Sequence, residues 1–164
     1  MRTEIRTRSA DDTRAVGEVL ASLLVARDVV ALSGDLGAGK TTFVQGVARG
    51  LGIRDQVVSP TFMLVREYQG RLDVLHVDVY RLNRVQEVVD LGLEDLFGGK
   101  AVALVEWGDA IEALLPRERL DVEITMSDPS GEDEERRLLL EGREGWGSRW
   151  ERLESALAPW GAAA

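Results

Sequence analysis

The residues with the clearest chemical potential are 34–41, which read G-D-L-G-A-G-K-T. They match the phosphate-binding pattern G-x-x-x-x-G-K-[ST] at every fixed position. Glycines let the backbone of such a loop curl its N–H groups around a phosphate, in dihedrals that a side chain disfavours. The ammonium of Lys40 can reach the β- and γ-phosphates, and the hydroxyl of Thr41 can bind Mg²⁺. The loop therefore predicts binding of a nucleoside triphosphate.

The choice of cation supports this interpretation. Lys40 and Lys100 are the only lysines among 20 basic residues. A phosphate loop needs a slim, point-like ammonium at the position of Lys40. The chain has a lysine there, although most of its basic residues are arginines with a broader guanidinium group.

The segments around the loop indicate how it is held. Residues 28–33 form a short apolar stretch that is typical of a buried parallel strand. Residues 42–49 carry apolar side chains at helical spacing, and Gly50 and Gly52 follow as a stop signal. This order of strand, loop and helix places a helix N-terminus, with its unpaired N–H groups, against the phosphates.

Composition narrows the classes of protein. At 164 residues, 45% hydrophobic and 30% charged, the chain is expected to form one domain with a real core. It has no cysteine and one histidine, which excludes disulfides, thiolate sites and a multi-histidine zinc site within one chain. No segment resembles a signal peptide or a membrane span, so we expect a cytoplasmic protein. The net charge of −9 argues against a general nucleic-acid binder.

The remaining pattern predicts an α/β fold. We expect an edge strand at 4–8 and a helix that is capped at Ser9 and continues to Leu24. A hairpin is expected at 62–80, one or two short helices at 85–97 broken at Gly92, and a buried strand at 101–106. Further strands are expected at 120–126 and 137–140, and a final helix at 148–157. Strands that alternate with helices indicate a three-layer architecture with some antiparallel pairing.

Two carboxylates compete for the metal ion that a phosphate loop requires at the end of a neighbouring strand. Glu106 ends the apolar run 101–105, and Asp78 lies in the alternating segment 76–80. A carboxylate within a sheet is costly to bury unless it meets a cation. Either residue can hold Mg²⁺ while the other orients the attacking water; the alternative for each is an exposed residue on its strand.

Other side chains near these motifs have two interpretations each. Residues 59–62 form either a switch segment that senses the γ-phosphate or an ordinary turn. His76 is more often a packed or hydrogen-bonded residue than a proton relay. Trp107 either walls the nucleotide site or packs in the core. Three late tryptophans are more simply a packing stripe than a docking edge: Trp146, Trp150 and Trp160.

Five motifs occur in a characteristic order and spacing. They are residues 34–42, S-P-T-F at 59–62, H-V-D-V-Y-R-L at 76–82, G-L-E-D at 92–95 and V-E-W at 105–107. With these motifs, residues 9–141 closely resemble the TsaE (YjeE) family of bacterial P-loop ATPases. Residues 141–164 match no motif of the family, so their role is unassigned within the single domain expected over 1–164.

The resemblance implies a P-loop NTPase fold, a three-layer αβα sandwich with a mixed, mainly parallel sheet. It implies a weak ATPase that uses ATP and Mg²⁺ and is required for threonylcarbamoyladenosine, the modified adenosine beside the tRNA anticodon. Its partners would be TsaD and TsaB, with tRNA reached only through that complex. The alternatives are a small-molecule kinase, although no paired-arginine lid is evident between Gly92 and Pro116, and a nucleotide-gated binding module.

The resemblance also implies the site residues. Thr41 and Glu106 would bind Mg²⁺, and Lys40, Asp78 and Glu106 would act in catalysis. The segment around Ala10 and Thr13 would lie near the adenine, and a late loop at Gly131 or Glu132 would approach the nucleotide. No arginine is evident as a finger in cis, Arg81 being a distant candidate. The expected nucleotide-binding residues are Ala10, Gly37, Ala38, Gly39, Lys40, Thr41, Thr42 and Asp78.

Overall fold

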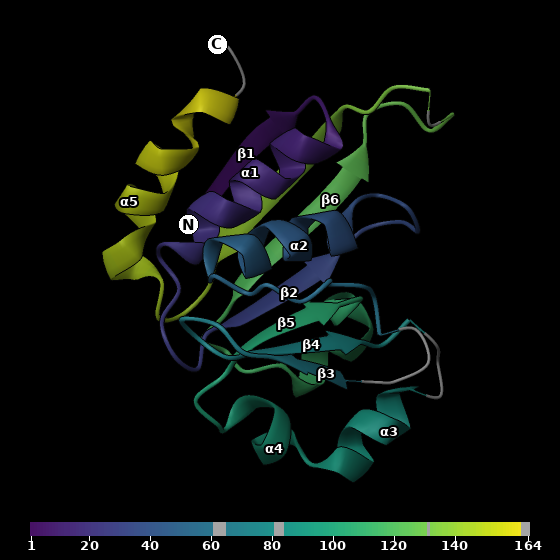
Figure 1. Cartoon of the computed structure of the whole chain (residues 1–164), viewed down its shortest axis with the longest axis vertical. Helices are drawn as coiled ribbons and strands as arrows, with labels where there is room; N and C mark the ends of the chain where they lie inside the picture. Colours follow the sequence, from purple (N-terminus) through teal and green to yellow (C-terminus); the bar gives the residue numbers. More distant parts are fainter. Residues whose placement is uncertain (61–64, 81–83, 131, 162–164) are drawn as a thin grey trace.

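The four central strands of the sheet run parallel to one another, and the strand pairings on either side of them are antiparallel. The computed structural model describes residues 1–60, 65–80, 84–130 and 132–161, and these form one seven-stranded sheet in the order β1-β7-β6-β2-β5-β4-β3 (Figure 1). Strands β6, β2, β5 and β4 are parallel, whereas β1, β7 and β3 are antiparallel to their neighbours. The strand bounds are β1 Arg2–Thr7, β2 Val29–Ser33, β3 Val65–Tyr68, β4 Val74–Asp78, β5 Val102–Glu106, β6 Leu120–Met126 and β7 Arg136–Gly142.

Helices cover both faces, as expected for a three-layer α/β fold. On one face, the helices share a core with alternate strand residues such as Val102 and Leu104. On the other face, the short helices share a second core with Ala103 and Val105. This double burial explains why β5 is apolar at every position before Glu106. The first face carries α1 Ala10–Ala21, α2 Lys40–Gly50 and α5 Gly147–Leu157; the second carries α3 Arg84–Leu91, α4 Leu93–Phe97 and the 3₁₀-helix η1 Gly108–Leu114.

Helix α1 begins as predicted and ends earlier than predicted. The hydroxyl of Ser9 accepts a hydrogen bond from the backbone N–H of Asp12 at 3.1 Å, which caps the helix. The helix ends at Ala21, so the expected continuation to Leu24 is wrong. Leu23 and Leu24 are buried, but they lie in the turn that leads back toward β2. The apolar spacing thus identified buried residues correctly and placed the helix end wrongly.

Helices α1 and α2 pack in close contact. A Cβ atom on Gly46 would lie 2.0 Å from the carbonyl oxygen of Arg14, so α1 and α2 touch backbone to backbone there. Because α2 begins at Lys40, this contact helps to position the helix that follows the phosphate-binding loop.

The C-terminal segment packs on the same core. Trp146 and Trp150 are buried in the first core, as the packing interpretation predicted, and Trp160 is partly buried against that core. The guanidinium of Arg149 forms two hydrogen bonds with the carboxylate of Asp28, at 2.6 and 2.9 Å. The segment ends in the short 3₁₀-helix η2 Ala158–Trp160. Within the described residues, no helix has the length and apolar character needed to cross a membrane.

Candidate functional site

The motif at 34–41 forms a loop between the end of β2 and the start of α2. Gly34, Gly37 and Gly39 all have positive φ angles, at 133°, 79° and 110°. A Cβ atom on Gly34 would also lie 2.1 Å from the carbonyl oxygen of Ile124. These conformations are the ones that glycine adopts without steric cost. The loop therefore has the backbone form that the motif predicts, at the carboxyl end of a central parallel strand.

Lys40 is folded back onto this loop. Its Nζ donates hydrogen bonds to the carbonyl oxygens of Gly34 and Asp35, at 2.6 and 2.9 Å. The same Nζ lies 3.8 Å from the ring centre of Trp107, a cation–π contact. Burial lowers the pKa of Lys40, and the nearby carboxylates, Glu106 first among them, act in the opposite direction. The ammonium is thus desolvated and held by neutral partners, ready to exchange them for phosphate oxygens.

Trp107 belongs to the site as well as to the core. It follows Glu106 with a left-handed φ of 62°, which turns its ring toward the loop. The ring lies 4.8 Å from that of Tyr80, and it also packs against the second core. The packing interpretation is therefore confirmed, and the contact with Lys40 supports the prediction that Trp107 walls the nucleotide site.

Thr41 and Glu106 meet directly. The Thr41 hydroxyl lies 2.8 Å from Oε1 and 3.0 Å from Oε2 of Glu106. Glu106 is buried, with only 3% of its surface exposed. Carboxylate and hydroxyl oxygens are the hard ligands that Mg²⁺ uses, together with substrate phosphates. These two side chains therefore fit the divalent cation that the family resemblance implies.

The second carboxylate lies on the adjacent strand. Asp78 ends β4 and is paired in register with Glu106 of β5. Its Oδ2 accepts a 2.6 Å hydrogen bond from the Ser59 hydroxyl, and its Oδ1 accepts one from the backbone N–H of Tyr80 at 3.0 Å. The structure thus brings both predicted carboxylates to one edge of the sheet, with Glu106 the one beside Thr41. Thr61, Phe62, Arg81 and Leu82 lie outside the described residues.

His76 is a packed and hydrogen-bonded residue, the interpretation favoured from sequence. It is fully buried on β4, and its Nε2 lies 2.5 Å from Oε2 of Glu106. The contact could not be read from the sequence, because it depends on the register between β4 and β5.

A small pocket opens beside the phosphate-binding motif. Its volume is about 90 Å³, and it brings Ala10 and Thr13 of α1, both expected near the adenine, together with the loop. Arg136 Nε donates to the carbonyl oxygen of Ala38 at 3.0 Å, which ties β7 to the loop. Sequence reasoning missed Arg136, since it belongs to a charge run at residues 132–137, E-D-E-E-R-R, of the kind that is typical of an exposed loop. The lining residues are Ala10, Thr13, Gly37, Ala38, Gly39, Thr42, Glu134 and Arg136.

The late loop that was expected to approach the nucleotide leads into β7, and its approach to the nucleotide stays a prediction. Gly131 lies outside the described residues, and Glu132 is exposed without lining this pocket. Glu134 and Arg136, which follow it, line the pocket. The antiparallel pairing of β7 with β6 sets where the chain re-enters the sheet after this loop.

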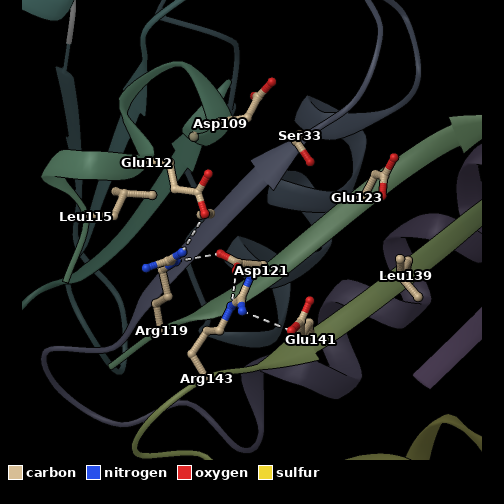
Figure 2. A pocket seen from close by; sticks show the side chains of 12 residues that line it. Ser33, Asp109, Glu112, Leu115, Arg119, Asp121, Glu123, Leu139, Glu141 and Arg143 are labelled. Carbon is tan, nitrogen blue, oxygen red and sulfur yellow. Dashed lines mark hydrogen bonds and ion pairs between the residues drawn. The ribbon is translucent and has the colours of Figure 1, made fainter. Parts of the chain in front are cut away.

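A second cavity, of about 200 Å³, lies over β2, β6 and β7 beside η1 (Figure 2). Asp121 accepts hydrogen bonds from the guanidinium groups of Arg119 and Arg143, each at 2.7 Å. Arg119 also pairs with Glu112, and Arg143 with Glu141. None of the predicted site residues lines this cavity.

Comparison with known proteins identifies the family. The family model described as threonylcarbamoyl adenosine biosynthesis protein TsaE matches residues 7–138. The chain is 47% identical over 130 residues to the tRNA threonylcarbamoyladenosine biosynthesis protein TsaE of Bacillus subtilis, covering 79% of each protein. It is 41% identical over 141 residues to the protein of that name from Streptomyces coelicolor, covering 84% of this chain and 93% of the relative.

A solved structure agrees in fold over nearly the full length. The crystal structure of Bacillus subtilis YdiB superposes with a TM-score of 0.77 at 38% identity, covering 97% of this chain and 95% of that one. The central parallel strands, the flanking helices and the glycine loop are those of a P-loop NTPase fold. The chain therefore belongs to the TsaE family of tRNA threonylcarbamoyladenosine biosynthesis proteins.

Proposed function

We propose that this protein is a Mg²⁺-dependent ATPase that supports formation of threonylcarbamoyladenosine and acts with TsaD and TsaB. The observation that carries the proposal is the convergence of Lys40, Thr41 and Glu106 around one loop, with the Thr41 hydroxyl 2.8 Å from the Glu106 carboxylate. A desolvated ammonium, a hydroxyl and a carboxylate in this arrangement suit the phosphates and metal ion of ATP.

Each side chain has a distinct task in hydrolysis. The loop N–H groups and the Lys40 ammonium hold the β- and γ-phosphates and stabilise the charge that develops on them. Thr41 and Glu106 hold Mg²⁺, which supplies further positive charge to the phosphate oxygens when bound. Asp78, on the strand beside Glu106, orients the attacking water. The reaction is a water attack on the γ-phosphate that releases ADP and phosphate.

Turnover should be slow without a partner. Arg136 lines the pocket beside the loop, but its guanidinium already donates to the carbonyl oxygens of Ala38, Asp133 and Glu135. A transition-state arginine typically supplies several orders of magnitude in rate. We therefore expect the protein alone to hydrolyse ATP weakly and the partner complex to stimulate it.

Apolar side chains around the site support docking of a partner protein. Leu36 in the loop, Val58 beside Ser59 and Tyr80 after β4 are 70%, 39% and 51% exposed. Large exposed apolar side chains gathered around one functional region are typical of interaction surfaces. We place the TsaD–TsaB contact at this end of the sheet.

The ATPase proposal is tested by steady-state hydrolysis with purified variants. Glu106→Gln and Asp78→Asn should each reduce turnover by roughly two orders of magnitude, because the first weakens a ligand of Mg²⁺ and the second removes the carboxylate that orients the attacking water. The matched control is Glu123→Gln, an exposed carboxylate on β6, which should match the wild type. Unchanged turnover in both site variants would refute the assigned roles.

The partner proposal is tested by co-purification with TsaD and TsaB, with and without ATP. Val58→Asp should weaken association, whereas Val25→Asp, which is 51% exposed and precedes β2 at the opposite end of the sheet, should not. Failure of the wild type to associate in any nucleotide state would remove the partner role and leave the ATPase proposal standing.

A further inference from the structure

His76 lies directly beneath the carboxylate of Glu106. Both His76 and Asp78 point to the α2 side of the sheet, because alternate residues of β4 share a face and Val77 and Val79 belong to the second core. His76 is 0% exposed, and its Nε2 lies 2.5 Å from Oε2 of Glu106. A fully buried imidazole thus touches one of the two side chains assigned to the metal ion.

The surroundings of the His76 ring define which of its two nitrogens carries the proton. Nδ1 of His76 is buried and has no hydrogen-bond partner within the part of the chain that the structure describes. A proton there would be a buried donor without an acceptor, at a cost of about 1–3 kcal/mol. The carboxylate of Glu106 can only accept, so the proton belongs on Nε2. His76 is therefore assigned as the neutral Nε2–H tautomer that donates to Glu106.

This bond restricts the carboxylate. The terminal torsion of a glutamate is soft, and Thr41 has a single hydroxyl proton to share between Oε1 and Oε2 at 2.8 and 3.0 Å. Thr41 alone therefore leaves the carboxylate able to rotate. With Nε2 bonded to Oε2, both donors hold the group in one orientation, with Oε1 toward Thr41.

We propose that His76 is a positioning residue that orients Glu106, and so assembles the Glu106–Thr41 pair that receives the divalent cation. The inference rests on the proposed function, because the cation arrives with the nucleotide. Residues that hydrogen-bond a metal ligand commonly change metal affinity by about 10- to 100-fold when they are removed. His76 would act through Glu106 without touching the nucleotide.

The tautomer can be tested without any nucleotide. His76 is the only histidine of the chain, so the ¹⁵N signals of its ring need no further assignment. A long-range ¹H–¹⁵N spectrum should show the neutral Nε2–H tautomer in the wild type, and Glu106→Leu should change it. A wild-type spectrum with the proton on Nδ1 would overturn the inference, whatever the protein binds.

The role in metal binding is tested by the affinity for the ATP analogue AMP-PNP, measured by calorimetry in Mg²⁺ and in EDTA. His76→Leu removes the donor at similar volume, and it should lose about tenfold or more of the gain in affinity due to Mg²⁺ while leaving the affinity in EDTA unchanged. His76→Gln can place an amide N–H near the position of Nε2, and it should recover most of that gain. The matched control is Tyr68→Phe, which removes the other buried unpartnered polar atom of the described residues and should have no effect.

The outcomes separate this inference from the proposed function. Wild-type protein that binds no nucleotide would refute the proposed function and, with it, the metal role of His76. Wild-type binding that Mg²⁺ strengthens, with the same gain in His76→Leu, would overturn the inference alone. An equal loss of affinity in Mg²⁺ and in EDTA would assign His76 a merely structural role and would also overturn it.

Discussion

Two polar clusters lie near the central strands, and they balance their charges in opposite ways. In the cavity of Figure 2, Arg119 and Arg143 share Asp121, and each has a further carboxylate partner. At the phosphate loop, Lys40 donates to backbone carbonyls. Among the described residues, no lysine or arginine forms an ion pair with Glu106 or Asp78. The charged groups of the cavity therefore neutralise one another, whereas the two carboxylates at the phosphate loop have no such partner in the described part of the chain.

This difference indicates a structural role for the cluster around Asp121 and a functional role for the cluster at the phosphate loop. Ion pairs that satisfy one another stabilise a fold, at modest net energy, and need no ligand. Buried charged groups that do not neutralise one another lower the stability of the fold. Proteins retain such groups mainly at sites that bind a ligand or catalyse a reaction. The cavity of Figure 2 has a volume of about 200 Å³, against about 90 Å³ for the pocket beside the phosphate loop. Despite its larger volume, we interpret it as a structural feature whose ion pairs connect η1, β6 and β7.

The largest effect is expected for Lys40→Ala. Loss of the ammonium should weaken nucleotide binding by at least about 30-fold, which corresponds to about 2 kcal/mol, because a desolvated charge contact with the phosphates disappears. Calorimetric titration with ADP measures the affinity, and circular dichroism should show an intact fold. The control is Lys100→Ala, the other lysine, which is exposed. An unchanged affinity in Lys40→Ala would contradict the phosphate-loop assignment.

The opposite result is expected in the second cluster. Arg119→Met should lower the free energy of unfolding by about 1–3 kcal/mol, since the side chain is only 10% exposed and bonds both Asp121 and the carbonyl of Pro116. Nucleotide affinity should not change. Urea denaturation measures the first quantity, and Arg117→Met, an exposed neighbour, should stay within about 0.5 kcal/mol of the wild type. A loss of nucleotide binding without loss of stability would reverse the roles of the two clusters.

A smaller effect is expected from alkaline pH. Phosphate binding requires the charged form of Lys40, and burial lowers the pKa of that group from its usual 10.5. Nucleotide affinity should therefore fall as pH rises through this lowered pKa, before an ordinary lysine would lose its proton. Lys40→Arg keeps its charge over the same range and should show a flat profile, whatever its absolute affinity. Wild-type affinity that stays constant up to pH 10.5 would show that the ammonium is not desolvated.

The sequence was sufficient for the features that depend on local pattern. The glycine loop, the strand before it and the helix after it were predictable because each has its own spacing or steric signature. The approach of Asp78 to Glu106 could also be expected, since both end strands of one parallel sheet. The choice between them could not, because it depends on which carboxylate reaches the Thr41 hydroxyl.

The missed features depend on contacts between distant segments. Arg136 reaches Ala38 across 98 positions of sequence, so the charge run that contains it gave no sign of the contact. The 3₁₀-helix η1 was not predicted, because Gly108–Leu114 lacks the length and apolar spacing of an amphipathic helix. The bond from His76 to Glu106 requires β4 and β5 to be neighbours in one register. Sheet order and register are properties of the whole chain, and no short motif encodes them.

The smallest effect is expected for Arg143→Gln, and it sharpens the account of the second cluster. The Arg143 side chain is 41% exposed, so its bonds to Asp121 and Glu141 should contribute less than about 1 kcal/mol to stability, and less still at high salt. The double variant with Arg119→Met should lose more stability than the two single losses together, because Asp121 then has neither guanidinium donor. Urea denaturation of the four proteins gives the coupling energy. Strict additivity would mean that the arginines act independently, and the cavity would then lack the shared pairing that distinguishes it from the phosphate loop.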